Sequence, residues 1–102
     1  MAVLRGNLGI TKTSYWKKVE MIEITLLFFA TLRDMTHETR ILKKVPAGMS
    51  IGELKDQMVL DYPNLAGIMN SVIVSMNHEF AFNNALVIEN AEIALFPPVS
   101  GG

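Results

Sequence analysis

Residues 22–29 read Ile-Glu-Ile-Thr-Leu-Leu-Phe-Phe, a segment that alternates in its first half and is wholly apolar in its second half. In an extended strand, this alternation puts four apolar side chains on one face: Ile22, Ile24, Leu26 and Phe28. Leu27 and Phe29 then point to the other face, which must meet another element or a partner. The segment therefore predicts a strand in the interior of a sheet, with its second half covered on both faces.

A second strand is predicted over residues 38–45. A polar loop that contains Arg33 and His37 precedes it, and Pro46-Ala47-Gly48 ends it. The two strands are therefore expected to form a hairpin with a long loop.

Ser50-Ile51-Gly52-Glu53 has the pattern of a capping box. The Ser50 hydroxyl can accept a hydrogen bond from the Glu53 amide, while the Glu53 carboxylate accepts one from the Ser50 amide. Three apolar residues share one helical face, and Tyr62-Pro63 stops the helix: Ile51, Leu54 and Met58. The pattern predicts one main helix that packs this apolar stripe against the hairpin.

The chain after this helix predicts a short helical turn and two extended segments. Pro63 suits the first turn of a helical segment, and residues 71–76 predict a third strand that ends at the Asn77-His78 turn. Phe80 and Phe82 flank Ala81 in a shorter extended piece, which Asn83-Asn84 ends.

The final strand, within residues 86–96, is apolar on both faces, because Ile93 and Leu95 occupy one face and Phe96 the other. Crossover connections are right-handed, so the first and last strands can lie side by side in parallel at the centre of the sheet. We therefore predict an α+β fold of the β-grasp (ubiquitin-like) type, a mixed four- to five-stranded sheet with one main helix packed on one face. Phe29 and Phe96 are then neighbours on one apolar patch, with ordinary core packing as the alternative.

The chain ends in Phe96-Pro97-Pro98-Val99-Ser100-Gly101-Gly102. Two terminal glycines add nothing to a core and carry a high backbone entropy, but bare backbone can enter a narrow channel where a Cβ would clash. The proline pair fixes φ twice and favours an extended exit from the last strand. The Gly102 carboxylate is therefore the predicted reactive group, and a frayed glycine-rich end is the alternative.

A chain of 102 residues that is 50% hydrophobic suits one domain. We predict an N-terminal extension of unknown role at 1–20, the β-grasp domain at 21–96 and the reactive tail at 97–102. Residues 1–20 hold four basic residues and one acidic residue, whereas residues 21–102 hold five and nine, a net charge of −4. An acidic body argues against nucleic acid as a partner and suits a basic docking face. No apolar run approaches the roughly 20 residues that span a bilayer, so no membrane association is expected.

The chain has no cysteine, which excludes disulfides, thiolate metal sites and a cysteine nucleophile and fits a reducing compartment. Its two histidines, His37 and His78, lie far apart and lack the spacing typical of a metal site. No serine has a motif that would pair it with a base. We therefore predict no metal site and no side-chain catalytic constellation.

The ending from Ala94 to Gly102 resembles the apolar-Pro-Pro-[Val/Ile]-[Ser/Thr]-Gly-Gly terminus of the molybdopterin synthase small subunit, a ubiquitin-like sulfur carrier family. Leu27-Phe28-Phe29-Ala30 followed by Arg33, and Val74 to Asn77, support the resemblance, which covers residues 22–102. The chain departs from the family at the turn before the last strand, where Glu89-Asn90-Ala91-Glu92 replaces a usual Gly-Asp pair. Asn90 tolerates positive φ, so we expect this turn to form.

The resemblance implies a function. An ATP-dependent, E1-like adenylyltransferase would adenylate the Gly102 carboxylate, and sulfur would then replace AMP to give a thiocarboxylate. The tail, with Gly101 next to its end, would enter the large catalytic subunit of molybdopterin synthase and deliver sulfur to cyclic pyranopterin monophosphate in molybdenum cofactor biosynthesis. The resemblance also implies a heterotetramer of two small and two large subunits, a cytoplasmic location, and no permanent cofactor beyond the transient AMP adduct and sulfur.

The residues expected to bind the partner comprise the aromatic pair, one basic residue and the tail: Phe29, Arg33, Phe96, Pro97, Pro98, Val99 and Ser100. For Arg33 the alternative is a solvated loop charge. Three other functions remain open, namely a thiamine-type sulfur carrier, a ubiquitin-like modifier joined to lysines, and a non-reactive interaction domain. The Phe-Pro-Pro-Val-Ser run favours the molybdopterin branch.

Overall fold

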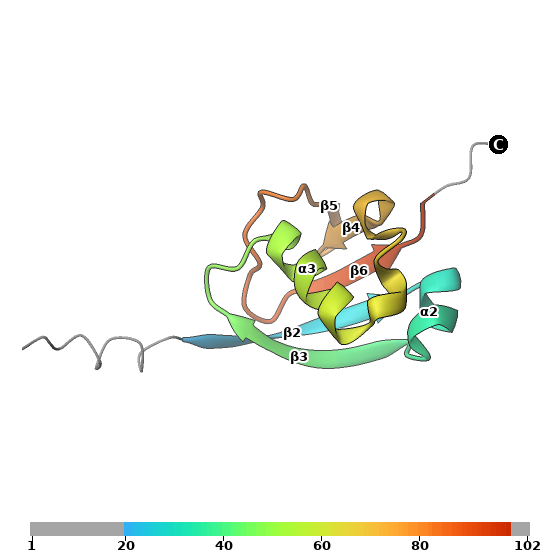
Figure 1. Ribbon diagram of the computed structural model, residues 1–102. Helices are drawn as coiled ribbons and strands as arrows, with labels where there is room; N and C mark the ends of the chain where they lie inside the picture. Colours follow the sequence, from blue (N-terminus) through green and yellow to red (C-terminus); the bar gives the residue numbers. More distant parts are fainter. Residues whose placement is uncertain (1–19, 99–102) are drawn as a thin grey trace, which may run out of the picture.

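A computed structural model describes residues 20–98, in which five strands form one mixed sheet (Figure 1). The strands are β2 (Met21–Phe28), β3 (Arg40–Pro46), β4 (Ile73–Met76), β5 (Glu79–Phe80) and β6 (Glu92–Phe96). They lie in the order β3-β2-β6-β4-β5. The two central strands, β2 and β6, pair in parallel, and every other pair is antiparallel. The predicted parallel pairing of the first and last strands is confirmed.

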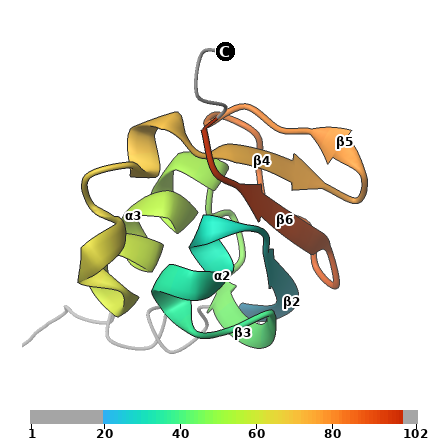
Figure 2. The ribbon, with the colours of Figure 1, turned by 90° about the vertical axis from the view of Figure 1, so that its right-hand side faces the viewer.

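One main helix, α3 (Ile51–Asp61), covers one face of the sheet (Figures 1 and 2). The capping box is present, because the Glu53 amide donates to Ser50 Oγ at 3.1 Å and the Ser50 amide donates to Glu53 Oε1 at 2.9 Å. The amides of Ile51 and Gly52 donate to the carbonyls of Ala85 and Asn83, at 2.8 and 2.9 Å. These bonds satisfy the first turn of the helix, whose amides have no partner within it.

The core lies between α3 and the sheet. All four residues on the predicted inner face of β2 are buried, and so is the apolar stripe of α3. Ile93 and Leu95 of β6 complete the centre of the core, with exposed fractions of 0% and 1%. The sequence periods of two in the strands and of three to four in the helix therefore identified the main core residues.

The segment after β2 is a short helix, α2 (Thr31–Thr36), where we had predicted a polar loop. Leu32 of this helix is fully buried, and Thr36 Oγ1 donates to the Leu32 carbonyl at 2.9 Å. Six residues are too few for a helical period to be recognised in a sequence. The helix is preceded by a tight turn in which the Leu32 amide donates to the Phe29 carbonyl at 3.0 Å and Ala30 has φ 51° and ψ −126°.

The segments after α3 differ in detail from the prediction. A short 3-10 turn, η2 (Pro63–Leu65), follows the helix as expected, but a second, η3 (Met69–Ser71), takes the start of the predicted third strand. This strand, β4, begins only at Ile73, because η3 satisfies the preceding backbone groups internally. The predicted turn at Asn77-His78 is confirmed by positive φ at both residues, 52° and 72°. Asn90 also has a positive φ, 66°, as expected for the turn before the last strand.

Candidate functional site

Two phenylalanines stack at the ends of the central strands. Phe29 directly follows β2, and Phe96 is the last residue of β6. Their ring centroids are 4.7 Å apart and their planes are 11° from parallel. The Phe29 amide donates to the Leu95 carbonyl at 3.2 Å, which extends the parallel pairing of the two strands as far as this aromatic pair.

The stacked rings lie on the face of the sheet that α3 leaves open. Phe28 is buried in the core, so the next side chain, Phe29, points to the opposite face, where it is 38% exposed. Phe96 is half-buried. The alternative of ordinary core packing therefore does not describe this pair, and the second half of the first strand is less covered than we had predicted.

Two further apolar side chains continue this surface and were missed in the sequence. Ile73 is the cross-strand neighbour of Phe96, and Phe80 pairs with Ser75 on the same face. They are 37% and 61% exposed. We refer to Phe29, Phe96, Ile73 and Phe80 as the sheet patch. Alternation along the strand would have predicted that Ile73, next to the buried Val74, points to the open face. Alternation does not specify which residues of the neighbouring strands lie beside Ile73.

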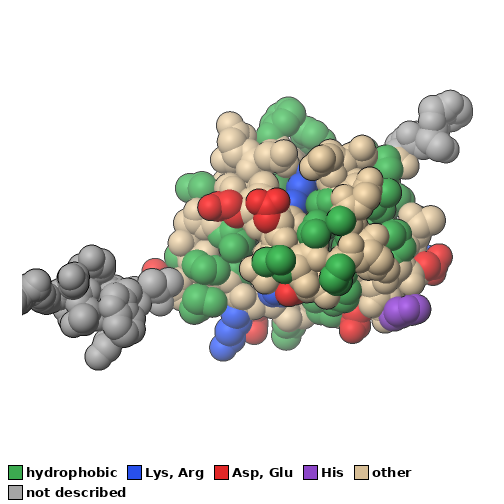
Figure 3. Space-filling model, viewed as in Figure 1, with side chains coloured by type: hydrophobic (Ala, Val, Ile, Leu, Met, Phe, Trp, Pro, Cys, Tyr) green, Lys and Arg blue, Asp and Glu red, His purple; other side chains and the backbone are tan. Residues whose placement is uncertain are grey.

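Charges of both signs lie on the open face of the sheet, although residues 21–102 have a net charge of −4. Arg40 and Lys44 of β3 are exposed on the open face, opposite Leu27 and Glu23 of β2. Glu92 of β6 is half-buried on this same face. The basic residues come from an edge strand, where charged side chains protect unpaired backbone from aggregation, so the net acidity of the chain does not describe this face. The opposite face of the molecule likewise carries scattered charges of both signs (Figure 3).

The other predicted partner-binding residues fall partly within the structure. Arg33 lies on α2 and is exposed, not in a loop. Pro97 is half-buried and Pro98 is exposed, directly after β6. Because β2 and β6 are parallel, both strands end on the same side of the molecule. The proline pair therefore leaves the sheet near Phe29 and α2 (Figure 1). Val99, Ser100, Gly101 and Gly102 lie outside the described residues.

Other chemistry is sparse in the part of the chain that the structure describes. Residues 20–98 contain no group of three His, Cys, Asp or Glu side chains that could hold a metal ion. None of the described helices has the length and apolar character needed to cross a membrane. Burial raises the pKa of the Tyr62 phenol, and the charges of Glu38 and Asp61 raise it further. Burial lowers the pKa of the Lys55 ammonium.

A family model described as the ThiS family matches residues 26–102, which include both strands of the central pair from Leu26 onward and the whole tail. The chain belongs to the ThiS family. Among curated relatives, it is 33% identical over 81 residues to the molybdopterin synthase sulfur carrier subunit of Arabidopsis thaliana, covering 79% of this chain and 84% of that protein. It is 31% identical over 83 residues to the subunit of the same name from Mycobacterium tuberculosis, covering 80% of this chain and all of that protein.

These relatives confirm the resemblance that the terminal motif indicated, so the chain is a ThiS-family member of the molybdopterin synthase sulfur carrier type. Among solved structures, it is similar to SAMP1 from Haloferax volcanii, with 26% identity, a TM-score of 0.68, and coverage of 78% of this chain and 99% of that chain. A chain in the complex of subunits 1 and 2 of the molybdopterin-converting factor from Helicobacter pylori matches with a TM-score of 0.56 and 20% identity, over 79% of this chain and 100% of that chain. The second likeness shows the β-grasp fold alone.

Proposed function

We propose that the ThiS-family chain carries sulfur as a thiocarboxylate on Gly102 and donates it within a molybdopterin synthase. The observation that carries the proposal is the stacked Phe29–Phe96 pair on the open face, beside the point where the Pro97-Pro98 segment leaves the sheet. An apolar docking patch next to a thin tail would fix the body of the carrier while the tail reaches into a partner's active site.

In the first step, the Gly102 carboxylate would attack the α-phosphate of ATP on an E1-like adenylyltransferase, and pyrophosphate would leave. The acyl-adenylate formed is a mixed anhydride, so its carbonyl is far more electrophilic than the carboxylate. A sulfur donor then attacks this carbonyl, AMP leaves, and a thiocarboxylate remains. AMP and sulfur are thus transient adducts of Gly102, and the protein needs no permanent cofactor for either step.

In the second step, the tail would enter the large catalytic subunit and transfer its sulfur to cyclic pyranopterin monophosphate. Each carrier supplies one sulfur atom, so one dithiolene requires two carriers, in keeping with a heterotetramer of two small and two large subunits. The sheet patch supports this docking, because exposed aromatic side chains with a polar border are typical of the centre of a protein interface. Arg33 on α2 would form part of that border, and Gly101 would keep the last segment thin. The absence of cysteine from the sequence fits a cytoplasmic location.

Intact-mass spectrometry tests the proposal on the full chain, incubated with ATP, a sulfur donor and an E1-like enzyme. The expected result is a gain of about 16 Da, from the exchange of one carboxylate oxygen for sulfur. A chain that lacks Gly102 is the control and should gain nothing, and a chain with one residue added after Gly102 should lose sulfur transfer while remaining folded. Absence of the gain with an enzyme of proven activity, or transfer by the extended chain, would contradict the mechanism.

A second candidate function is that of a ubiquitin-like modifier, which the likeness to SAMP1, the small archaeal modifier protein 1 of Haloferax volcanii, favours. In that case the same activated Gly102 would be attacked by a lysine amine of a target protein, and an isopeptide bond would form with loss of AMP. Mass spectrometry of cell extracts digested with a protease that cleaves after glutamate distinguishes the two functions, because residues 93–102 joined by an isopeptide bond to target lysines would indicate a modifier.

A further inference from the structure

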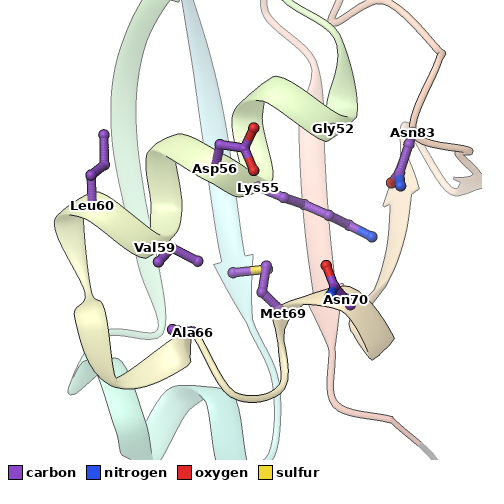
Figure 4. Close-up of a pocket in the computed structure, with 9 residues that line it drawn as sticks. All are labelled: Gly52, Lys55, Asp56, Val59, Leu60, Ala66, Met69, Asn70 and Asn83. Carbon is purple, nitrogen blue, oxygen red and sulfur yellow. The ribbon is translucent and has the colours of Figure 1, made fainter.

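A cavity of about 400 Å³ lies between α3 and the segment that carries η2 and η3 (Figure 4). One end of the cavity is apolar and is formed by Val59, Ala66 and Met69. The other end is polar, because the side chain of Lys55 extends toward Asn70 and Asn83 (Figure 4). This volume falls at the lower end of the range of small-molecule sites, and an apolar floor with a few converging polar groups is their usual construction.

The polar groups at this end are not used by the fold. Within residues 20–98, the side chains of Lys55, Asn70 and Asn83 form no hydrogen bond or ion pair with one another or with any other described residue. Lys55 is half-buried, and this burial lowers the pKa of its ammonium group. A partly desolvated ammonium without a partner is unfavourable, so a ligand that supplies acceptor atoms would gain more here than at an exposed lysine.

The backbone fixes the position of Asn83. Its carbonyl accepts a hydrogen bond from the Gly52 amide at 2.9 Å, within the first turn of α3. A Cβ added at Gly52 would lie 3.4 Å from both the carbonyl oxygen and the Cβ of Asn83, so the first turn of α3 packs closely against this residue. The helix α3 therefore carries Lys55 and holds the backbone of Asn83, whereas Asn70 and Asn83 are exposed at the mouth of the cavity.

A second hollow of about 280 Å³ shares Lys55, Asn70 and Asn83 with the first and continues toward β4 and β5. Lys55 thus lines both hollows. Asp56 lines the first cavity as well and adds a negative charge to its rim. The Asp56 carboxylate repels a ligand with several negative charges, such as a phosphate ester, more strongly than it repels a monoanion.

We propose that this cavity binds a small monocarboxylate with an apolar body. The carboxylate accepts hydrogen bonds from Lys55 Nζ and from the side-chain amides of Asn70 and Asn83, and the apolar body covers Val59, Ala66 and Met69. None of the residues lining the main cavity belongs to the sheet patch. The second hollow is lined by Ile73 and Phe80 of the sheet patch, but neither hollow is lined by Phe29 or Phe96, so a carboxylate bound in the main cavity leaves this stacked pair free.

The test is a titration of the isotope-labelled full chain with hexanoate, followed by amide NMR spectra. The expected result is a saturable shift of the Gly52 backbone amide and of the side-chain amides of Asn70 and Asn83, with a dissociation constant of about 1 mM for so small a ligand. The Phe29 and Phe96 amides should not shift. Hexanol and hexylamine, which have the same chain without the carboxylate, and inorganic phosphate should give no saturable shift.

Two variants keep the test decisive. Lys55→Met keeps most of the apolar stem of the side chain and removes its charge, and it should weaken hexanoate binding about tenfold, as expected for the loss of one charge-assisted hydrogen bond. Lys44→Met, on the exposed part of β3, is the matched control and should leave binding unchanged. If Lys55→Met fails to fold, Asn70→Ala at an exposed position replaces it, with a weakening of about threefold expected. The proposal would be overturned if the shifts did not saturate, or if hexanol or phosphate bound as tightly as hexanoate. It would also be overturned if Lys55→Met, or Asn70→Ala in its place, bound hexanoate as tightly as the unchanged protein.

Discussion

Ala30 has a backbone conformation that an alanine rarely adopts, and replacing it with glycine should stabilise the protein. Its φ of 51° and ψ of −126° place it at the second position of the tight turn between β2 and α2. This is the type II′ geometry, in which positive φ at that position normally requires glycine. The turn sets both the end of β2 and the start of α2, so the strain is located next to the stacked Phe29–Phe96 pair.

The magnitude follows from two opposing terms. A non-glycine residue held in such a region costs about 1–3 kcal/mol, and Ala30→Gly would remove this cost. Glycine adds about 0.5–1 kcal/mol of conformational entropy to the unfolded chain, which acts in the opposite direction. Ala30 is exposed, so the lost methyl group buries little surface. The net stabilisation is therefore between zero and about 2.5 kcal/mol, and for a domain of this size each kcal/mol raises Tm by about 4–8 °C.

Urea and thermal unfolding of Ala30→Gly, followed by circular dichroism, measure this effect. Ala47→Gly is the matched control, because Ala47 is also exposed in a turn but does not have positive φ. The control should lose about 0.5–1 kcal/mol through the entropy term alone. If both variants are destabilised to the same extent, Ala30 stores no strain and the reasoning is wrong.

Three other predictions concern docking, helix capping and pH. Phe29→Asp should weaken binding to the large subunit by at least about tenfold in calorimetry while the free domain stays folded; Leu60→Asp, at a position on α3 that is 73% exposed, is the control and should bind normally. Ser50→Ala should cost about 1 kcal/mol of unfolding free energy, because it removes the cap of α3; an unchanged urea midpoint would mean that the capping box does not stabilise the helix. Because burial, Glu38 and Asp61 raise the pKa of Tyr62 above 10.0 in the folded state, the unfolded chain ionises first, and stability should be lost as pH rises through the folded pKa. Tyr62→Phe should make this alkaline loss shallower, and an identical loss in the variant would show that other groups cause it.

Most of the fold was predictable, because its main elements carry strong local patterns. The alternation in residues 22–29 identified β2 and its buried face, and the capping box fixed the first residue of α3. The short helix α2 was not predictable, because it depends on the strained turn at Ala30 and on the burial of Leu32 by residues distant in the sequence. Tertiary contacts, not helix propensity, stabilise a helix of this length.

The candidate site was only partly predictable. The adjacency of Phe29 and Phe96 followed from the parallel pairing of the first and last strands, and the structure confirms it. The contribution of Ile73 and Phe80 depends on cross-strand neighbours, which the sequence of one strand does not specify. The cavity beside Lys55 was not predictable either, because it is formed by α3, by η3 and by a residue after β5 that the Gly52 amide holds.

The central position of β6 has a consequence for the synthesis of the protein. This strand is the last element of the domain, yet it lies between β2 and β4 and forms the middle of the core. Its pairing joins residues far apart in the chain, such as Leu26 and Ile93, so the sheet cannot be completed until nearly the whole chain has been made. A chain that stops before β6 therefore loses the fold together with the tail. Because β6 ends at Phe96, only termination within the last residues of the chain could leave a folded domain without its terminal glycines.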